Sequence, residues 1–143
     1  MVLFLSCFLV SAAPPRETDP ATRVELASRI ATLRVERAEG DARLQAWRAQ
    51  LKERGPAVVA MAMGSPDLAP HLRSLMDQEL EVAQLEVQFG PNWPALREAK
   101  AREEVARTAL AKQVEKELAA QEVELEVTKY VLGVLEKELE KMP

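Results

Sequence analysis

Apolar residues recur at alternating spacings of three and four along most of this chain, and this pattern constrains the fold more than any other feature. In the first such stretch they are Leu26, Ile30, Leu33, Leu44, Trp47 and Leu51, with Arg37 and Gly40 at the two intervening positions. Such spacing forms one stripe on a helix and is typical of a coiled-coil seam. Asp19-Pro20 is a helix start and Gly55-Pro56 a helix stop, so we expect a helix over 20–54.

Two more helices are expected, one from Pro66 or Pro70 to about residue 89 and one over about 94–142. The apolar stripe of the second contains Leu68, Leu72, Leu75, Val82 and Phe89; that of the third contains Leu96, Ala99, Ala106, Leu110, Val114, Leu118, Leu125, Leu132, Leu135, Leu139 and Met142. The third stripe shifts by one residue between Leu110 and Val114, which is a stutter that unwinds a supercoil without breaking the helix.

The helix lengths predict how the three segments pack. At ~1.5 Å per residue the third helix is about 73 Å long, and the first two together are about 80 Å long. One long C-terminal helix can therefore pack along two shorter helices placed end to end. Aromatic residues make up 4% of the chain and charged residues 29%, which suits extended helices better than a thick core. We predict an all-α fold: an elongated antiparallel coiled-coil hairpin formed by residues 21–143.

The segment QFGPNWPALREA, residues 88–99, interrupts the helical pattern and supplies the reversal of the hairpin, with the turn at 90–93. We expect Gly90 to adopt a left-handed C-cap conformation, while Pro91 prevents the helix from continuing. Pro94 suits the first position of the next helix. Phe89 and Trp93 are then placed to cover the hairpin end.

A second interruption, AVVAMAM at 57–63, carries no charge. One interpretation is a short helix or hinge packed against a neighbouring helix. The other is an exposed apolar patch of Val58, Val59, Met61 and Met63 that contacts another subunit or lipid, because methionines form adaptable surfaces.

The charges of the first two helical segments have opposite signs. Residues 21–54 contain eight basic and five acidic residues, whereas residues 55–89 contain one basic and five acidic residues. Opposite net charges favour contact between these segments, within one chain or between copies. The alternative is a solvated helix surface with no such role.

The N-terminal residues 1–13 form a signal peptide or the remnant of a membrane helix. The apolar run from Val2 to Ala13 is shorter than a membrane span and has the length of a signal-peptide core, although no basic residues precede it. Residues 14–20 form a linker. Both interpretations predict an exported protein, periplasmic or anchored in the inner membrane facing the periplasm, with membrane contact only through residues 1–13. Cys7, the one cysteine, lies in this segment, where lipid modification is a further alternative.

No residue pattern for catalysis, a cofactor or a metal ion is present. His71 has no second histidine or cysteine at ligand spacing, and no serine lies in a nucleophile-elbow context. Carboxylates occur as charge runs on helix surfaces, which do not desolvate one of a pair as acid–base catalysis requires. We therefore expect no enzyme activity and no cofactor. The net charge of −4, without an isolated basic cluster, argues against nucleic-acid binding.

Residues 26–142 resemble the periplasmic helical region of polysaccharide co-polymerases, the chain-length determinants of bacterial exopolysaccharide and lipopolysaccharide export. In that family a long helix ends in an aromatic-Gly-Pro-x-His-Pro turn and another long helix follows. Phe89, Gly90, Pro91 and Pro94 match this turn, and Trp93 stands in place of the histidine.

The resemblance implies an oligomer around a growing or exported glycan, in contact with the polysaccharide-assembly machinery, with chain length set by assembly geometry. It covers the helical arm alone, since no second membrane helix, membrane-proximal sheet or nucleotide-binding loop accompanies it, and it transfers no glycan-binding residue. The competing interpretation is a stand-alone envelope coiled coil that acts as an adaptor, chaperone-like protein or spacer. In either case we expect homo-oligomers or an envelope protein partner bound through helical faces.

Overall fold

The computed structural model describes residues 19–142 and contains four α-helices within that range. These are α1 (Pro20–Arg54), α2 (Pro56–Met63), α3 (Ala69–Gln88) and α4 (Pro94–Lys141). The expected signal peptide or membrane remnant at 1–13, and most of the linker, lie outside the described residues. No strand occurs between Asp19 and Met142.

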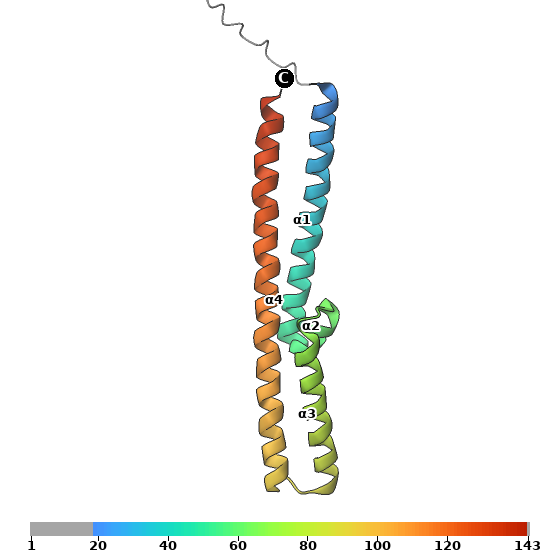
Figure 1. Cartoon of the computed structure of the whole chain (residues 1–143), viewed down its shortest axis with the longest axis vertical. Helices are drawn as coiled ribbons and strands as arrows, with labels where there is room; N and C mark the ends of the chain where they lie inside the picture. The colour runs from blue at the N-terminus through green and yellow to red at the C-terminus, as the bar shows by residue number, and fades with distance from the viewer. Residues whose placement is uncertain (1–18, 143) are drawn as a thin grey trace, which may run out of the picture.

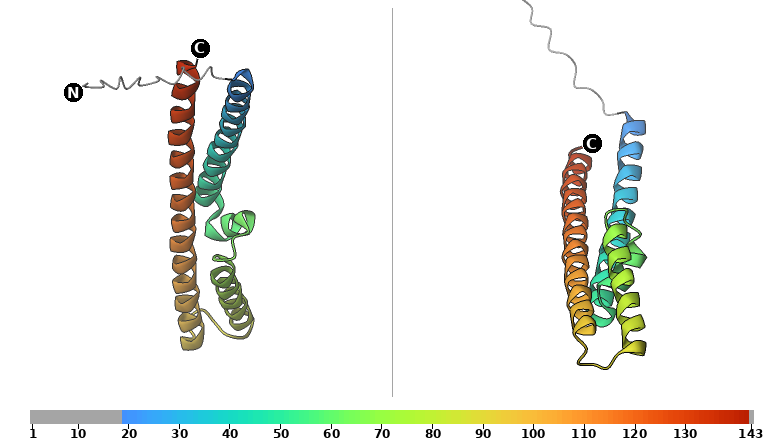
Figure 2. Two further views of the ribbon diagram at one scale, coloured as in Figure 1. Left: turned by 45° about the horizontal axis from the view of Figure 1, so that its top comes forward. Right: turned by 60° about the horizontal axis from the view of Figure 1, so that its bottom comes forward.

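The helices form the predicted elongated hairpin. Helix α4 runs the whole length of the molecule, with α3 beside its first half and α1 beside its second half (Figure 1). Figure 2 shows the same two pairings from other directions. The start of α1 and the end of α4 lie together at one end, and the turn between α3 and α4 forms the opposite end. The all-α antiparallel arrangement is therefore confirmed.

Local signals set the helix boundaries. The Asp19 Oδ1 atom accepts a hydrogen bond from the backbone N–H of Ala21 at 3.2 Å, as expected of an N-cap. Gly55 at φ 85° separates α1 from α2, and Gly64 at φ 60° ends α2 in the left-handed region, which favours glycine. Helix α3 begins at Ala69, near the later of the two predicted starts, because the Leu68 N–H donates to the Ser65 carbonyl at 3.1 Å in a turn that occupies the preceding residues.

The predicted seam of α1 faces α4 over its whole length. Ile30 and Leu44 are buried and the other seam residues are half-buried, including the two that are not apolar, Arg37 and Gly40. At Gly40 the two helices approach closely: a Cβ atom added there would lie 2.5 Å from Leu125 Cδ2. The gap in the apolar pattern is thus the place where a leucine of α4 fits against the α1 backbone.

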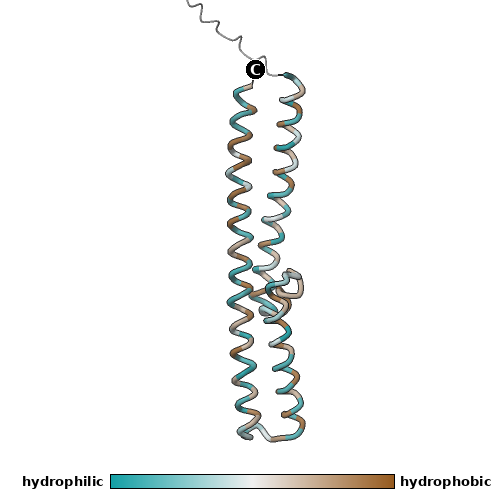
Figure 3. Tube along the Cα trace, in the orientation of Figure 1, coloured by the Kyte–Doolittle hydropathy of each residue, from teal (hydrophilic) through white to brown (hydrophobic). Residues whose placement is uncertain are grey.

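The thickest part of the core lies at the junction where α1 ends and α3 begins. Leu110, Val114 and Leu118 of α4 are fully buried there. They pack in one cluster with residues of the other three helices and of the turn before α3, namely Leu44, Val59, Ala60, Leu68 and Leu75. The predicted stutter therefore lies where α4 changes partner. Ala106, Leu110, Val114 and Leu118 follow one another at spacings of four residues, which keeps the apolar face of α4 turned toward the junction. Figure 3 shows hydrophobic residues alternating with hydrophilic ones along both long helices.

The expected contact between the oppositely charged segments has a different form. Helices α1 and α3 do not contact each other; the two segments meet through the uncharged α2, while α1 and α3 each pack on α4. The ion pairs between helices follow α4: Arg34 and Arg48 of α1 lie 2.6 and 2.8 Å from glutamates of its second half. Basic residues of α1 therefore pair with acidic residues in the second half of α4, while acidic residues of α3 pair with basic residues in its first half.

Candidate interaction site at the hairpin tip

The described residues offer no metal site. Between Asp19 and Met142 no group of three or more His, Cys, Asp or Glu side chains is placed to hold an ion. His71 is half-buried in the first turn of α3. Within the same range, no helix combines the length and the apolar character needed to cross a bilayer.

The turn at the hairpin tip is held by three backbone hydrogen bonds. The Phe89 N–H donates to the Leu85 carbonyl at 2.8 Å and closes α3. The Trp93 N–H donates to the Gly90 carbonyl at 3.0 Å, which is the bond of a β-turn, and the Trp93 carbonyl accepts from Arg97 at 3.1 Å in the first turn of α4. The turn is consequently a defined structure with both helix ends attached to it.

Two aromatic rings cover this turn. The Phe89 and Trp93 rings stack with their centroids 4.9 Å apart and their planes 7° apart. Val82, Leu96 and Ala99 form a small buried cluster that joins α3 to α4, and Leu85 packs against it. Trp93 is 49% exposed, so the stack presents an aromatic surface to the outside.

The expected left-handed C-cap at Gly90 is wrong. The C-cap is Phe89, in the extended conformation at φ −131° and ψ 151°, and the positive-φ glycines among the described residues are Gly55 and Gly64. The chain already leaves the helix at Phe89, and Pro91 favours an extended conformation at Gly90, the residue directly before it. A Cβ atom at Gly90 would meet no atom within 4 Å.

Two interpretations of the segment 57–63 were open, a short packed helix and an exposed patch. The structure shows a short helix packed against its neighbours. Val59 is fully buried in the junction core, Met63 is half-buried against it, and Val58 is half-buried. Met61, at 59% exposed, is the one residue of the four that faces outward. These four residues therefore do not form a single exposed patch.

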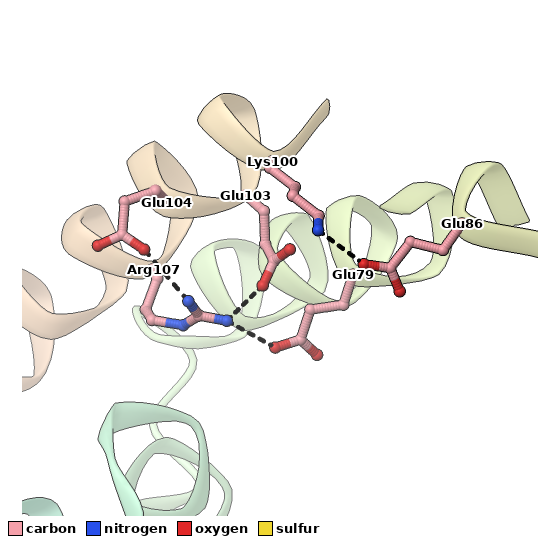
Figure 4. Close-up of polar contacts among 6 residues, drawn as sticks. All are labelled: Glu79, Glu86, Lys100, Glu103, Glu104 and Arg107. Atoms are coloured by element: carbon pink, nitrogen blue, oxygen red, sulfur yellow. Dashed lines mark hydrogen bonds and ion pairs between the residues drawn. The ribbon is translucent and has the colours of Figure 1, made fainter. Parts of the chain in front are cut away.

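A group of charged residues links α3 to α4 between the tip and the junction (Figure 4). The Arg107 guanidinium contacts Glu103 and Glu104 of its own helix and lies 3.6 Å from Glu79 of α3; Lys100 lies 2.9 Å from Glu86. The hydrogen bond to Glu103 raises the pKa of Arg107, aided by the neighbouring carboxylates and opposed by desolvation. Both cations in Figure 4 have carboxylate partners, and the pairs of Arg107 with Glu79 and of Lys100 with Glu86 link α4 to α3.

The sequence analysis missed a set of exposed apolar residues on the outer surface of the hairpin. Val123, Val127, Tyr130 and Val134 of α4 are between 39% and 74% exposed. They follow the same three-and-four spacing as the seam, displaced by two residues, so a search for a second stripe in each helix finds them.

The tip and the outer surface of α4 are two features available for interaction within 19–142. Both offer aromatic and aliphatic side chains, which suit contact with a protein surface better than chemistry on a small molecule. Comparison with known protein families, curated proteins and solved structures gave no match.

Proposed function

We propose that this protein is a non-catalytic helical arm of the bacterial cell envelope that holds an aromatic tip, residues 89–94, against a protein partner. The observation that carries the proposal is the stacking of Phe89 on Trp93, which is 49% exposed on an ordered turn. Tryptophan and other aromatic residues on a rigid support are the usual anchors of protein interfaces.

The shape of the hairpin gives the tip a defined position. Helix α4 has 48 residues, and at ~1.5 Å per residue it is about 72 Å long. The tip therefore lies about 70 Å from the end where α1 begins and α4 finishes. If residues 1–13 attach the chain to the inner membrane, the tip extends across the periplasm; if they are a signal peptide, the arm is a periplasmic spacer of the same length.

The process that we propose is the assembly or export of surface polysaccharide. Support comes from the resemblance of Phe89, Gly90, Pro91 and Pro94 to the turn of chain-length determinants, together with a long helix on each side of it. In this proposal the partner belongs to the polysaccharide-assembly machinery, and no residue of the arm acts on the glycan chemically.

A second candidate function is a stand-alone adaptor between envelope proteins. The ring of Trp93 favours it, because the resembling family has histidine at that position and an exposed indole adds apolar contact area. The two candidates share the tip and differ in the partner.

The test is deletion of the gene in the organism that makes the protein, followed by complementation. We expect deletion to change the length distribution of a surface polysaccharide on gels, wild type to restore it, and Trp93→Ala to fail. Met76→Ala is the matched control, since Met76 is 56% exposed on α3 away from the tip and should restore the wild-type pattern.

Three outcomes separate the proposals. An unchanged polysaccharide profile in the deletion strain contradicts the polysaccharide role. A photo-reactive residue at position 93 that then cross-links an envelope protein outside the polysaccharide-assembly machinery supports the adaptor, whereas a cross-link to a component of that machinery supports the first proposal. Cell fractionation that finds the protein in the cytoplasm contradicts both.

A further inference from the structure

Helix α4 carries a continuous line of exposed residues on the side away from the helices that pack against it. Beyond the junction, α1 is the only described helix in contact with α4 (Figure 1). The line is formed, from residue 112 to residue 141, by the residues that lie two positions after each buried or half-buried residue of the α4 seam. Two residues correspond to about 200° around a helix, so these side chains lie nearly opposite the seam. We call this line the outer stripe.

The middle of the outer stripe is apolar. It is formed by Ala120, Val123, Val127, Tyr130 and Val134, all of them exposed. The three valines and the tyrosine are between 39% and 74% exposed. The spacing of three and four residues between them is that of a coiled-coil seam, so the stripe has the form of a second seam without a partner helix.

Both ends of the outer stripe are basic, with Lys112 and Lys116 at one end and Lys137 and Lys141 at the other. Residues 111–142 contain five lysines and eight glutamates, yet four of the lysines and none of the glutamates lie on the stripe. Within 19–142 these four lysines form no ion pair, whereas the fifth, Lys129, lies 2.6 Å from a glutamate of its own helix. The charge on the stripe is therefore not compensated by the described part of the chain.

A second copy of this chain does not supply the missing carboxylates. Two outer stripes in contact would place lysines against lysines in either direction, because the stripe has the same order of residue types from both ends. On α1, the positions from 24 to 49 that face away from α4 carry no carboxylate. Helix α3 has 20 residues and is too short to cover the stripe from Lys112 to Lys141.

A lipid surface also fits the outer stripe less well than a helix does. Glu126 and Glu138 are exposed and lie about 60° to either side of the stripe. A flat anionic bilayer would meet these carboxylates together with the lysines, whereas a single helix lies along the stripe alone. The narrow apolar line with acidic borders therefore favours a protein helix.

We infer that the outer stripe binds a helix of another protein, one that carries an aliphatic seam with carboxylates at both ends. The valines of α4 pack between the side chains of that seam. The four lysines require acidic residues opposite them, which sets the register and excludes helices that are apolar or basic at those positions. From Lys116 to Lys137 the stripe is about 32 Å long, so the two acidic ends of the partner lie about 20 residues apart.

This surface is separate from the tip. Lys112 follows Pro94 by 18 residues, so about 27 Å of α4 lies between the start of the stripe and the tip. The inference holds whether or not the tip binds a partner of its own.

The test uses the full-length chain and a synthetic helical peptide of about 30 residues as the probe, the length of the stripe. The peptide has a seam of five aliphatic residues with two glutamates at each end, so its seam is the same in both directions. A matched peptide has lysines in place of these glutamates. The fluorescence anisotropy of each labelled peptide, at about 0.15 M salt, gives its Kd.

We expect the acidic peptide to bind and the basic peptide not to bind. Reversal of all four stripe lysines to glutamate should weaken the acidic peptide by about tenfold or more, since four exposed ion pairs are lost, and should allow the basic peptide to bind. The matched control makes the same change of net charge at four exposed cations outside the stripe, Arg29, Arg43, Lys52 and Arg73, and should preserve the preference for the acidic peptide.

Four results would overturn the inference. The first is failure of the acidic peptide to bind while the helicity of the protein is intact by circular dichroism. The second is equal weakening by the stripe and control reversals, which would indicate unspecific charge attraction. The third is binding to vesicles of equal parts phosphatidylglycerol and phosphatidylcholine, lost on reversal of the stripe lysines, without peptide binding. The fourth is a light-scattering mass above one chain that Val127→Glu reduces and Val87→Glu does not, which would assign the stripe to a second copy.

Cross-linking in the cell tests the natural partner. A photo-reactive residue at position 127 should capture a segment with acidic residues on both sides of an apolar stretch, identified by mass spectrometry. Position 87 is the matched control, because Val87 is 88% exposed on α3, outside the stripe, and should not capture that segment. Capture at position 127 of a segment without acidic residues, or of no protein, would contradict the inference.

Discussion

Replacement of Gly40 by alanine tests the packing of α1 on α4 directly. Gly40 lies inside α1, where alanine is normally favoured over glycine by about 1 kcal/mol. The structure opposes that gain, because the new Cβ atom would lie 2.5 Å from Leu125 Cδ2. Real atoms do not approach so closely, so the leucine side chain or the helix must move.

The two effects can be compared in magnitude. Overpacking of a close contact costs about 1–3 kcal/mol, against a helix-propensity gain of about 1 kcal/mol. Since the Leu125 methyl group is the end of a flexible side chain, the lower half of that range applies. We expect Gly40→Ala to lower the free energy of unfolding by up to about 1 kcal/mol.

Gly133→Ala is the matched control. Gly133 is also helical, but no atom lies within 4 Å of the Cβ position, so alanine should raise the free energy of unfolding by about 1 kcal/mol. The assay is urea unfolding followed by circular dichroism at one protein concentration. The double variant Gly40→Ala with Leu125→Ala should recover the propensity gain relative to Leu125→Ala alone.

An equal rise in stability for Gly40→Ala and Gly133→Ala would refute the reasoning. It would mean that Leu125 does not press on the α1 backbone, and the register of the hairpin would then be wrong.

Three other substitutions test particular elements of the fold. Gly90→Ala should change the free energy of unfolding by less than about 0.5 kcal/mol, whereas Gly64→Ala should lower it by about 1 kcal/mol. Gly64 has a left-handed backbone and Gly90 does not, and thermal melts of the two variants distinguish them. Leu118→Ala should cost about 2–5 kcal/mol in urea unfolding, since this side chain is fully buried at the junction. Arg107→Gln should cost about 0.5 kcal/mol or less, because its ion pairs are solvent-screened, and the cost should shrink as salt is added to the melt.

The order and direction of the helices could be predicted from the sequence because the seam residues repeat regularly. The spacing from Leu26 to Leu51 predicted which face of α1 meets α4, and the helix lengths predicted the antiparallel pairing. The stutter at Leu110 and Val114 was also visible, although its cause, the junction with α2, was not.

What could not be predicted depends on contacts distant in sequence. From sequence alone, Gly40 is a residue that lowers the stability of its helix. Only the structure shows that its missing side chain leaves room for Leu125 of α4. Gly90 followed by Pro91 reads as a left-handed cap, yet the proline already diverts the chain. The packing of Val59 was left open because an uncharged run has the same composition whether it is buried or exposed. At the tip, the sequence identified Phe89 and Trp93, and the structure added their stacking.

The central claim is that the chain forms a closed hairpin with its tip far from both described ends. The measurement that tests it most directly is fluorescence energy transfer between dyes at cysteine pairs in the Cys7→Ser background, with unlabelled protein in excess to suppress transfer between copies. The pair Thr22 and Lys141 should show high transfer, because the two helix ends lie together. The pair Asn92 and Lys141 should show almost none, since about 70 Å separates the ends of α4. Low transfer for both pairs would indicate an open rod and contradict the account.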